Sequence, residues 1–275
     1  MITPHKRTYL MCEPKFFTVA YEINPWMQKS NPTNTAKAVQ QWKNLVAAYH
    51  DLGHEVRFID PLSNCPDMVY TANGATVYNG NFYLSNFTYH QRRPESAAFA
   101  VWAQEAGFSF SEAKERNEGE GDILFAGPLI LAGSSFRTSP KAHQELASLW
   151  HREVITLELV DPRFYHLDTA LIVLEGTRGQ TSEAAKIAYY PPAFSQSSRE
   201  KLKTLFPDAI CATDTDAEVL GLNAVSDGKH VVLNPKAEHL RAQIIERGYD
   251  TIGIDTSELL LGGGGIKCCT LELRS

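Results

Sequence analysis

A helix that ends at a stop signal and is followed by a strand occurs five times along the 275-residue chain. The stops are Gly53, Gly107, the region near residue 151, Pro207 and Gly248. Apolar residues at helical spacing precede each stop, and an apolar or alternating run typical of a strand follows it. This recurrence constrains the fold more than any single motif, because five units of about 55 residues would account for the whole chain.

The helices carry recognisable start signals. Asn34 is a typical N-cap, and the apolar side chains after it fall on one helical face. Ser139 is a second cap, and Pro140 suits the first position of a helix. The other helices are expected to begin near Pro94, Ser198 and Ala237. Strands are expected after the helices, at residues 56–59, 108–110, 154–159, 209–211 and 251–254.

Turn signals predict a β-hairpin before each of the last four helices. The hairpins are expected at residues 76–87, 123–132, 169–187 and 222–234. Their turns hold Asn79-Gly80, Gly127-Pro128, Gly176 with Gly179, and Asp227-Gly228. Further strands are expected at residues 8–12 and 269–274, near the two ends of the chain.

Two α/β architectures fit this order of elements. Alternating strands and helices are typical of a doubly wound parallel sheet. The alternative is a ring of five ββαβ modules, in which the two terminal strands complete the first module. Hairpins before the helices disfavour all-parallel winding, and no Pro-, Gly- or Ser-rich linker divides the chain. We therefore expect one domain of repeats spanning residues 1–275.

Charge and cysteine usage exclude several classes of protein. The net charge is −6 and the pI about 5.9, with no dense Lys/Arg run, so neither nucleic acid nor a membrane surface is an expected partner. No window approaches 18 apolar residues, and the N-terminus lacks an apolar signal core. The five cysteines form no Cys-x-x-Cys pair, which disfavours a disulfide scaffold and a zinc site. A cytoplasmic location is expected.

Four consecutive glycines, residues 262–265, precede Lys267, Cys268 and Cys269. Glycine allows close approach of the backbone to a ligand, and a thiol at the end of such a loop can be rigidly placed as a nucleophile. The alternative is a flexible tail that carries two buried strand cysteines.

Polar residues elsewhere could complete a catalytic site. His166 and Asp168 are two residues apart, so on a strand they would face the same side, unless they form a surface pair. The segment 118–122, which we call the acid loop, places Glu118, Glu120 and Asp122 among glycines. Such carboxylates could act in acid–base catalysis or hold a cation, and the alternative is a solvated loop. Residues 66–74 are either part of a site or a plain buried strand that ends in a turn.

Three arginines are candidates for binding a substrate carboxylate in bidentate fashion: Arg92, Arg93 and Arg137. An isolated arginine is more often a surface charge.

In this order, the segments resemble the guanidine-modifying enzymes of the amidinotransferase superfamily. The resemblance runs from Tyr9-Leu10-Met11-Cys12 to the C-terminal strand, and it rests on the acid loop, then His166-Leu-Asp-Thr, then Gly-Gly-x-x-Lys-Cys268. Members include arginine deiminase, dimethylarginine dimethylaminohydrolase and arginine dihydrolase. The resemblance implies the pentein fold, a five-bladed α/β propeller with pseudo-fivefold symmetry, which agrees with the five units.

The resemblance also implies roles for single residues. Cys268 matches the nucleophile, with Cys269 pointing the other way along the strand, and His166 matches the general acid/base with Asp168 as its companion. The spacing Glu-Gly-x-Gly-Asp, as in the dihydrolase, matches Glu118 as the catalytic acid with Asp122, and it leaves Glu120 as a rival.

Residues expected to bind substrate follow from the same comparison. Arg137, in Ser-x-Arg-Thr, resembles the arginine that grips the α-carboxylate, and Arg92 or Arg93 resembles a second active-site arginine. Asn73 stands where the deiminase has an Asp that pairs with the guanidinium. Asn73 and the segment around Asn24 both resemble the dihydrolase.

The resemblance implies cysteine-dependent hydrolysis of a guanidino group through a covalent thiouronium, without metal or organic cofactor. The expected substrate is a small molecule, L-arginine or a methylated arginine. Arginine dihydrolase, which gives ornithine, ammonia and carbon dioxide, ranks first. Dimethylarginine dimethylaminohydrolase, which gives citrulline and dimethylamine, and arginine deiminase are alternatives. An amidinotransferase or a non-enzymatic binder is more remote. The sequence leaves the oligomeric state open, and a homo-oligomer is compatible with it.

Overall fold

The computed structural model describes residues 2–175 and 185–274. Its strands form five three-stranded sheets, each with one of the longer helices between its two parallel strands in chain order. The longer helices are α1 (Thr35–Asp51), α2 (Arg93–Glu105), α3 (Pro140–Trp150), α4 (Gln196–Leu205) and α6 (Glu238–Glu246). Each sheet contains one antiparallel and one parallel strand pair. The expected ββαβ modules are thereby confirmed.

Cα-contact clustering divides the chain into two compact units, which we name after their candidate catalytic residues. The cysteine unit consists of Lys6–Glu120 and Asp255–Ser275. The histidine unit consists of Met1–His5 and Gly121–Ile254. The prediction that residues 1–275 form a single domain stays a prediction.

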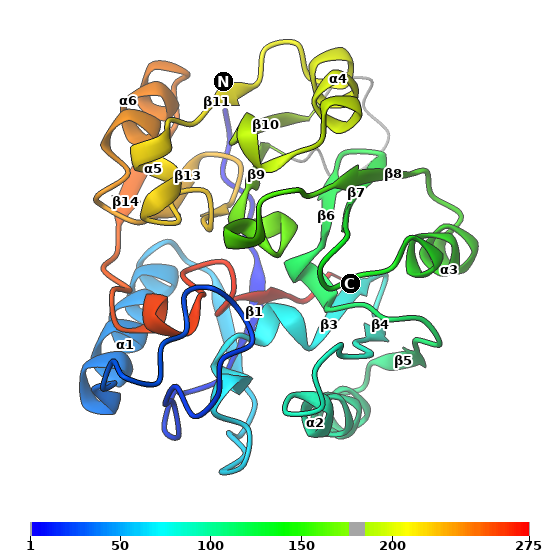
Figure 1. The fold of residues 1–275 in the computed structure, drawn as a ribbon, viewed down its shortest axis with the longest axis vertical. Helices are drawn as coiled ribbons and strands as arrows, with labels where there is room; N and C mark the ends of the chain where they lie inside the picture. The colour runs from blue at the N-terminus through cyan, green and yellow to red at the C-terminus, as the bar shows by residue number, and fades with distance from the viewer. Residues whose placement is uncertain (1, 176–184, 275) are drawn as a thin grey trace. The chain divides into compact units, whose positions relative to one another are not determined.

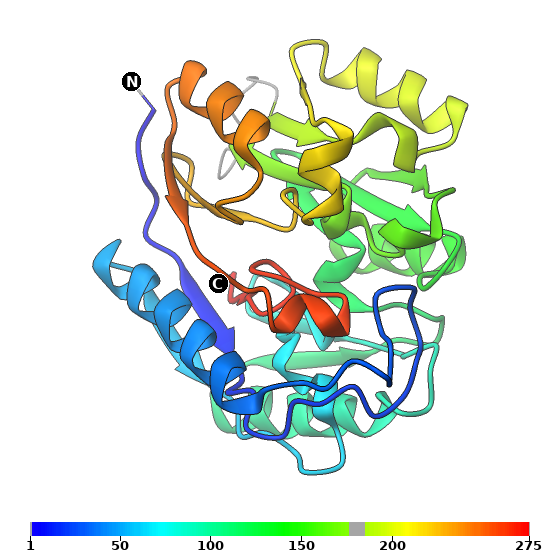
Figure 2. The ribbon, with the colours of Figure 1, turned by 60° about the vertical axis from the view of Figure 1, so that its left-hand side comes forward.

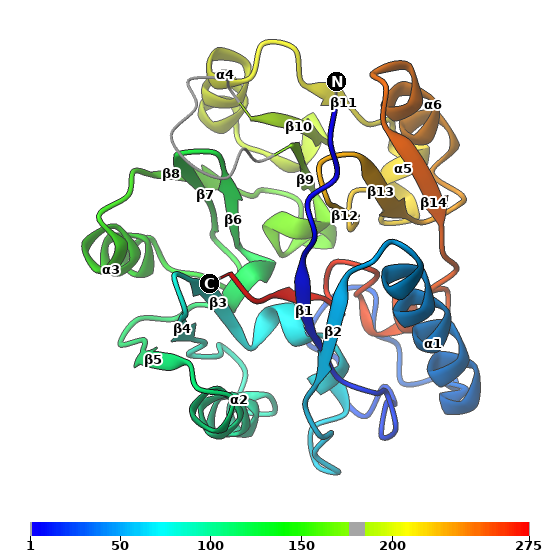
Figure 3. The same cartoon turned by 180° about the vertical axis from the view of Figure 1, so that it is seen from behind.

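The cysteine unit contains two sheets. The first has the order β15 (Leu271–Glu272), β1 (Thr8–Met11) and β2 (Glu55–Phe58), so strands from the two ends of the chain complete one module as predicted. Figure 3 shows β1 and β2 side by side, with α1 next to β2. The second sheet is β3 (Ala75–Tyr78), β4 (Asn81–Leu84) and β5 (Ser109–Glu112). A core that includes Leu10, Val77, Phe82, Phe99 and Leu271 joins the two sheets.

The histidine unit contains the other three sheets. Their strands are β6 (Ile123–Ala126), β7 (Leu129–Ser134) and β8 (Val154–Glu158); β9 (Leu171–Glu175), β10 (Lys186–Tyr189) and β11 (Ile210–Cys211); and β12 (Val225–Ser226), β13 (His230–Leu233) and β14 (Asp250–Gly253). Figure 1 shows α3 beside the sheet of β6, β7 and β8. One leucine of each long helix is completely buried: Leu146, Leu202 and Leu240. These leucines attach α3, α4 and α6 to the core of the unit.

Local signals in the sequence set most of the boundaries. The side chain of Asn34 accepts a hydrogen bond from the Lys37 backbone N–H, and that of Ser139 accepts one from Ala142, so both predicted caps are confirmed. Asn79 and Gly80 have φ angles of +48° and +68°, the left-handed pair that a tight hairpin turn requires. The predicted turn at Gly176 and Gly179 lies outside the described residues.

Two local expectations and one alternative were wrong, and one element was missed. Residues 66–74 form two 3₁₀ turns, Pro66–Val69 and Thr71–Asn73, and not a strand. His166 precedes a 3₁₀ turn, Leu167–Thr169. The strand expected at 269–274 is reduced to β15, so Cys268 and Cys269 lie in a turn before it. The short helix α5 (Asp214–Glu218) was missed, although Thr213 and Asp216 form a capping box visible in the sequence.

Candidate active site

Cys268 lies in a tight turn that we call the cysteine turn, residues 267–270. The Thr270 backbone N–H donates to the Lys267 carbonyl at 2.9 Å, which leaves Cys268 and Cys269 as the two middle residues. The Cys268 carbonyl accepts a hydrogen bond from the Ala72 N–H at 3.0 Å. Backbone contacts therefore fix Cys268 against the 3₁₀ turn that holds Asn73.

The glycine run before the cysteine turn is needed because other side chains lie directly on its backbone. A Cβ at Gly262 or Gly264 would collide with the Tyr70 ring, and a Cβ at Gly263 would lie 2.7 Å from the Asn24 amide. Asn24 also donates to the Gly262 carbonyl at 3.1 Å. Figure 2 shows this red segment beside the dark-blue N-terminal segment of the same unit. The run is thus a packed loop, and the alternative of a flexible tail was wrong.

Arg92 organises the segment around Asn73. Its guanidinium donates to the Asn73 side-chain Oδ1 at 2.7 Å and to the Asp67 carbonyl at 3.1 Å. It also makes a bidentate contact with Glu95, at 2.9 and 2.8 Å. Burial alone would lower the pKa of Arg92, but Glu95 raises it well above its usual value, so the guanidinium stays charged. Arg93 is exposed and donates only weakly to the Phe87 carbonyl at 3.4 Å.

The two glutamates of the acid loop have different partners in the cysteine unit. Both are completely buried. Glu118 accepts a hydrogen bond from the Thr88 N–H at 3.2 Å, and its charge acts on Arg92. Glu120 is instead ion-paired with Lys267 and Arg274. The carboxylate of Glu118 therefore acts on Arg92, and that of Glu120 is engaged by Lys267 and Arg274; the role of Glu118 as the catalytic acid stays a prediction.

Sequence reasoning missed one buried carboxylate near Arg92. Asp67 is buried, and its Oδ2 accepts a hydrogen bond from the Tyr21 hydroxyl at 2.9 Å. One signal in the sequence could have identified Asp67. It lies six residues before Asn73, in the segment 66–74 that was singled out for its mixed polar and apolar character. Asp67 adds negative charge to the same region, and burial with this neighbouring charge raises the pKa of Tyr21.

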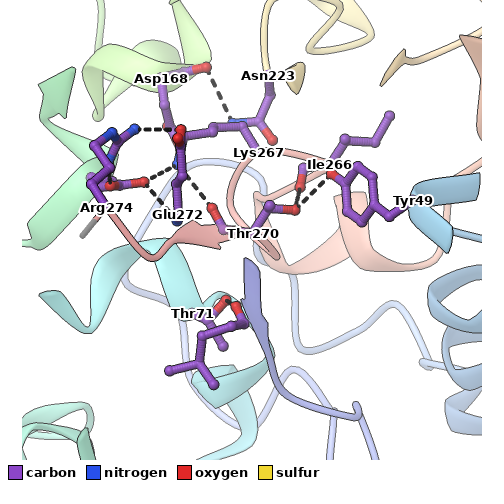
Figure 4. Close-up of polar contacts among 11 residues, drawn as sticks. Tyr49, Thr71, Asp168, Asn223, Ile266, Lys267, Thr270, Glu272 and Arg274 are labelled. Atoms are coloured by element: carbon purple, nitrogen blue, oxygen red, sulfur yellow. Dashed lines mark hydrogen bonds and ion pairs between the residues drawn. The ribbon is translucent and has the colours of Figure 1, made fainter. Parts of the chain in front are cut away.

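In the histidine unit, His166 and Asp168 are both buried, but His166 precedes a 3₁₀ turn and Asp168 lies within it, so neither is on a strand. The His166 carbonyl accepts a hydrogen bond from the Thr169 hydroxyl at 2.7 Å. The Asp168 carbonyl accepts one from the Asn223 side chain at 3.2 Å (Figure 4). The expectation that His166 and Asp168 face the same side of a strand was therefore wrong, because these contacts close the backbone into a turn.

Asp122 holds the two polar segments of this unit together. Its Oδ1 accepts from the Leu167 N–H at 3.0 Å, and its Oδ2 accepts from the Thr138 hydroxyl at 2.7 Å. Leu167 follows His166, and Thr138 follows Arg137. Both oxygens of this buried carboxylate thus have protein partners, which suits a role in positioning better than the predicted contact with substrate.

Arg137 and His166 both lie close to the aromatic ring of Tyr165. The Arg137 guanidinium lies 4.6 Å from the centre of the Tyr165 ring, and the His166 ring lies 4.7 Å from it. Ser135, two residues before Arg137, has a φ of +108°, which L-residues rarely adopt. Strain of this kind is concentrated at functional sites. Tyr165 was not singled out from the sequence, where only its position next to His166 marked it.

A buried histidine of this unit, His143, should make the stability of the protein depend on pH. His143 contacts the Gly133 carbonyl at 3.0 Å, and burial lowers its pKa to about 4. The unfolded chain takes up this proton near pH 6.5, so the stabilisation is present above that pH and is lost as the pH falls towards 4. We expect the free energy of unfolding in urea to fall by about 3 kcal/mol over this window because of this group. His143→Gln should remove that component, and equal pH slopes for both proteins would contradict it.

The described parts of the chain contain no group of three or more His, Cys, Asp or Glu side chains placed to hold a metal ion. Nor do they contain a helix that is both long enough and apolar enough to span a bilayer. The expectation that no cofactor is needed stays a prediction.

Comparison with known proteins gives consistent matches. The family described as N,N dimethylarginine dimethylhydrolase, eukaryotic, matches residues 14–175. N(G),N(G)-dimethylarginine dimethylaminohydrolase of Mycobacterium tuberculosis is 48% identical over 272 residues, which cover 99% of this chain and 87% of that protein.

Two further matches concern one cyanobacterial protein. The bifunctional arginine dihydrolase/ornithine cyclodeaminase ArgZ of Synechocystis sp. is 34% identical over 96% of this chain, which spans only 37% of ArgZ. A crystal structure of a mutant N-terminal domain of ArgZ bound to substrate, an arginine dihydrolase, has a TM-score of 0.92 at 33% identity. That match covers 98% of this chain and 99% of the domain.

Proposed function

The chain belongs to the N,N-dimethylarginine dimethylhydrolase family, and from this premise we propose that it is a cysteine-dependent arginine dihydrolase. The five-sheet fold is that of the pentein superfamily, which the motifs indicated. The relatives are hydrolases of guanidino C–N bonds, so the chain is an enzyme of this class. The substrate and the number of hydrolytic rounds are the proposed part.

In the first round, the Cys268 thiolate attacks the guanidinium carbon of L-arginine. His166 protonates the departing ammonia, and a covalent thiouronium remains on the sulfur. His166 then takes a proton from water, which attacks the same carbon and returns the thiolate with release of citrulline. The carboxylates of Glu118 and Asp168 orient the substrate cation, and Arg137 binds its carboxylate. In the second round, citrulline and water give ornithine, carbon dioxide and ammonia.

The orientation of Asn73 is the observation that supports two rounds. A guanidinium only donates hydrogen bonds, so the Asn73 atom that contacts Arg92 at 2.7 Å must be the oxygen. The amide nitrogen Nδ2 is then turned away from Arg92, and within the described residues this buried atom has no hydrogen-bond partner. A buried donor favours a ligand that accepts. A ureido oxygen accepts, whereas a guanidinium does not.

The test supplies L-arginine, citrulline or Nω,Nω-dimethylarginine and measures ornithine, citrulline, ammonia and dimethylamine. We expect ornithine and two ammonia per arginine. Asn73→Asp replaces the donor with an anion, so citrulline should accumulate and ornithine release should fall at least about tenfold. The matched control is Asn86→Asp, since Asn86 is an amide of the same unit that bonds the Lys114 carbonyl. Accumulation of citrulline in the unmodified enzyme would overturn the second round.

Dimethylarginine dimethylaminohydrolase is the second candidate. It is supported by the 48% identity with the Mycobacterium tuberculosis protein of that name. Release of dimethylamine and citrulline from dimethylarginine, without ornithine from arginine, would favour it. An amidinotransferase would instead need an amine acceptor for turnover. Cytoplasmic location and homo-oligomerisation stay predictions.

A further inference from the structure

Glu118 and Glu120 of the acid loop have different partners, and Gly119 between them sets the backbone conformation of the loop. Gly119 has a φ of +57°, and a Cβ there would lie 2.6 Å from the Ala72 carbonyl oxygen and 2.5 Å from that of Ala75. Only glycine fits this backbone. Both glutamates of this short segment are completely buried, and Glu118 accepts a hydrogen bond from the Thr88 N–H whereas Glu120 accepts one from Lys267.

Glu120 is the centre of a buried ion-pair network, and Figure 4 labels three other members of it, Lys267, Glu272 and Arg274. Its Oε2 accepts from the Lys267 ammonium at 2.8 Å and from the Glu272 backbone N–H at 3.3 Å. Its Oε1 pairs with the Arg274 guanidinium. Arg274 also pairs with the Glu272 side chain at 2.8 Å, so two carboxylates balance the charges of Lys267 and Arg274.

Through Lys267, the network reaches the cysteine turn itself. Besides Glu120, the Lys267 ammonium donates to the Thr270 carbonyl at 2.9 Å, while the Thr270 N–H donates to the Lys267 carbonyl at 2.9 Å. Two hydrogen bonds therefore join the ends of the turn across Cys268 and Cys269. The Thr270 hydroxyl completes the anchorage, with contacts of 2.8 Å to the Ile266 carbonyl and 2.9 Å to the Tyr49 hydroxyl (Figure 4).

The strength of this arrangement depends on its charges being complete. A buried carboxylate is costly unless every oxygen is satisfied, and loss of one partner leaves the others uncompensated. A neutral amide at position 120 would keep the shape but would leave Lys267 without its counter-charge. The ammonium would then be drawn towards solvent, and its bond to the Thr270 carbonyl would be weakened.

We propose that Glu120 is a positioning residue for Cys268, acting through Lys267 to hold the cysteine turn in its reactive conformation. This rests on the proposed function in that Cys268 is taken as the nucleophile. It assigns separate tasks to the two acids of one loop: Glu118 faces the substrate cation, and Glu120 fixes the thiol. A reacting group must be held within a fraction of an ångström, so a loosened turn should slow the chemical step more than substrate binding.

The experiment compares Glu120→Gln with Glu272→Gln. Glu272 is a carboxylate of the same network that pairs with Arg7 and Arg274 but not with Lys267. We expect Glu120→Gln to lower kcat by about 10- to 100-fold with KM changed less than about threefold, and Glu272→Gln to keep kcat within about threefold of the unmodified enzyme. Circular dichroism and thermal melting verify that both variants are folded.

Iodoacetamide labelling followed by peptide mass spectrometry gives a second readout that needs no substrate. In Glu120→Gln, labelling of Cys268 should become about fivefold faster, because the loosened turn exposes the buried thiol to the reagent. Cys12 and Cys65 are buried in the same unit and serve as internal controls whose labelling should not change. The labelling result is informative even if arginine is not the substrate, so failure of the proposed function and failure of this inference are distinguishable.

Several results would overturn the proposal. These are a kcat of Glu120→Gln within twofold of the unmodified enzyme, an equal loss in Glu272→Gln, and labelling that rises equally at Cys12 and Cys65. If Glu120→Gln does not fold, Glu120→Gln combined with Lys267→Met removes both buried charges. Because the two residues act through one contact, this double variant should lose no more kcat than Lys267→Met alone. Additive losses would contradict the proposal.

Discussion

Cys268→Ser should lower turnover of arginine by roughly 10³-fold or more, because a hydroxyl is a far weaker nucleophile than a thiolate near neutral pH. The substitution changes one atom in a turn whose backbone is fixed at the Cys268 carbonyl by the Ala72 N–H, so the fold should be retained. Ammonia release under saturating arginine measures the effect. Mass spectrometry of acid-quenched reactions should detect the thiouronium on the unmodified enzyme and none on the variant.

Cys269→Ser is the matched control, one residue along the same turn. Cys269 is also buried, and its backbone N–H donates to the Gly265 carbonyl at 3.2 Å, a contact that serine keeps. This variant should retain most of the activity and still form the covalent adduct. The reverse pattern, with Cys268→Ser active and Cys269→Ser inactive, would move the nucleophile to Cys269.

The repeated modules could be predicted because local signals specify them. Caps such as Asn34 and Ser139, stops such as Gly107 with its φ of +82°, and the hairpin turn at Asn79 act within a few residues of themselves. Such signals are visible in the sequence, and they set the order of helices and strands. The pairing of the two terminal regions followed only from counting modules, since nothing local joins β1 to β15.

The polar segments could not be predicted as turns because distant contacts shape them. Residues 71–73 are held by Arg92 and by the hydrogen bond from Ala72 to Cys268, and Leu167 is held by Asp122 from 45 residues away. Local preference does not encode these partners. A strand was therefore assumed for His166 and Asp168, and it was left open as the alternative for residues 66–74.

The choice between adjacent candidates also depended on the folded structure. Motif spacing found both arginines and both glutamates but could not say which partners each of them contacts. Burial and partners separate them: Arg92 contacts Asn73, whereas Arg93 is exposed. Glu120 is engaged by Lys267, whereas Glu118 is not. Glu118 and Glu120 are only two residues apart in the sequence, but the turn at Gly119 gives them different partners.

His166→Gln should lower kcat by about 10²- to 10⁴-fold, the usual contribution of general acid–base catalysis. Glutamine fills a similar volume and can form hydrogen bonds, but it cannot give a proton to the leaving ammonia or take one from water. The Thr169 hydroxyl bonds the backbone carbonyl of residue 166 and not its side chain, so the 3₁₀ turn should be retained. Steady-state ammonia release with arginine measures the loss.

The matched control is His143→Gln, since His143 is a buried histidine of the same unit whose ring contacts Thr156 and the Gly133 carbonyl. It should affect stability at low pH but change kcat less than about threefold at pH 7.5, where both proteins are folded. If His166 is the proton carrier, the rate of the first covalent step and that of adduct hydrolysis should both fall in His166→Gln, because each step moves a proton. A loss below about tenfold, or an equal loss in His143→Gln, would assign the proton transfers to another group and leave His166 a structural role beside Tyr165.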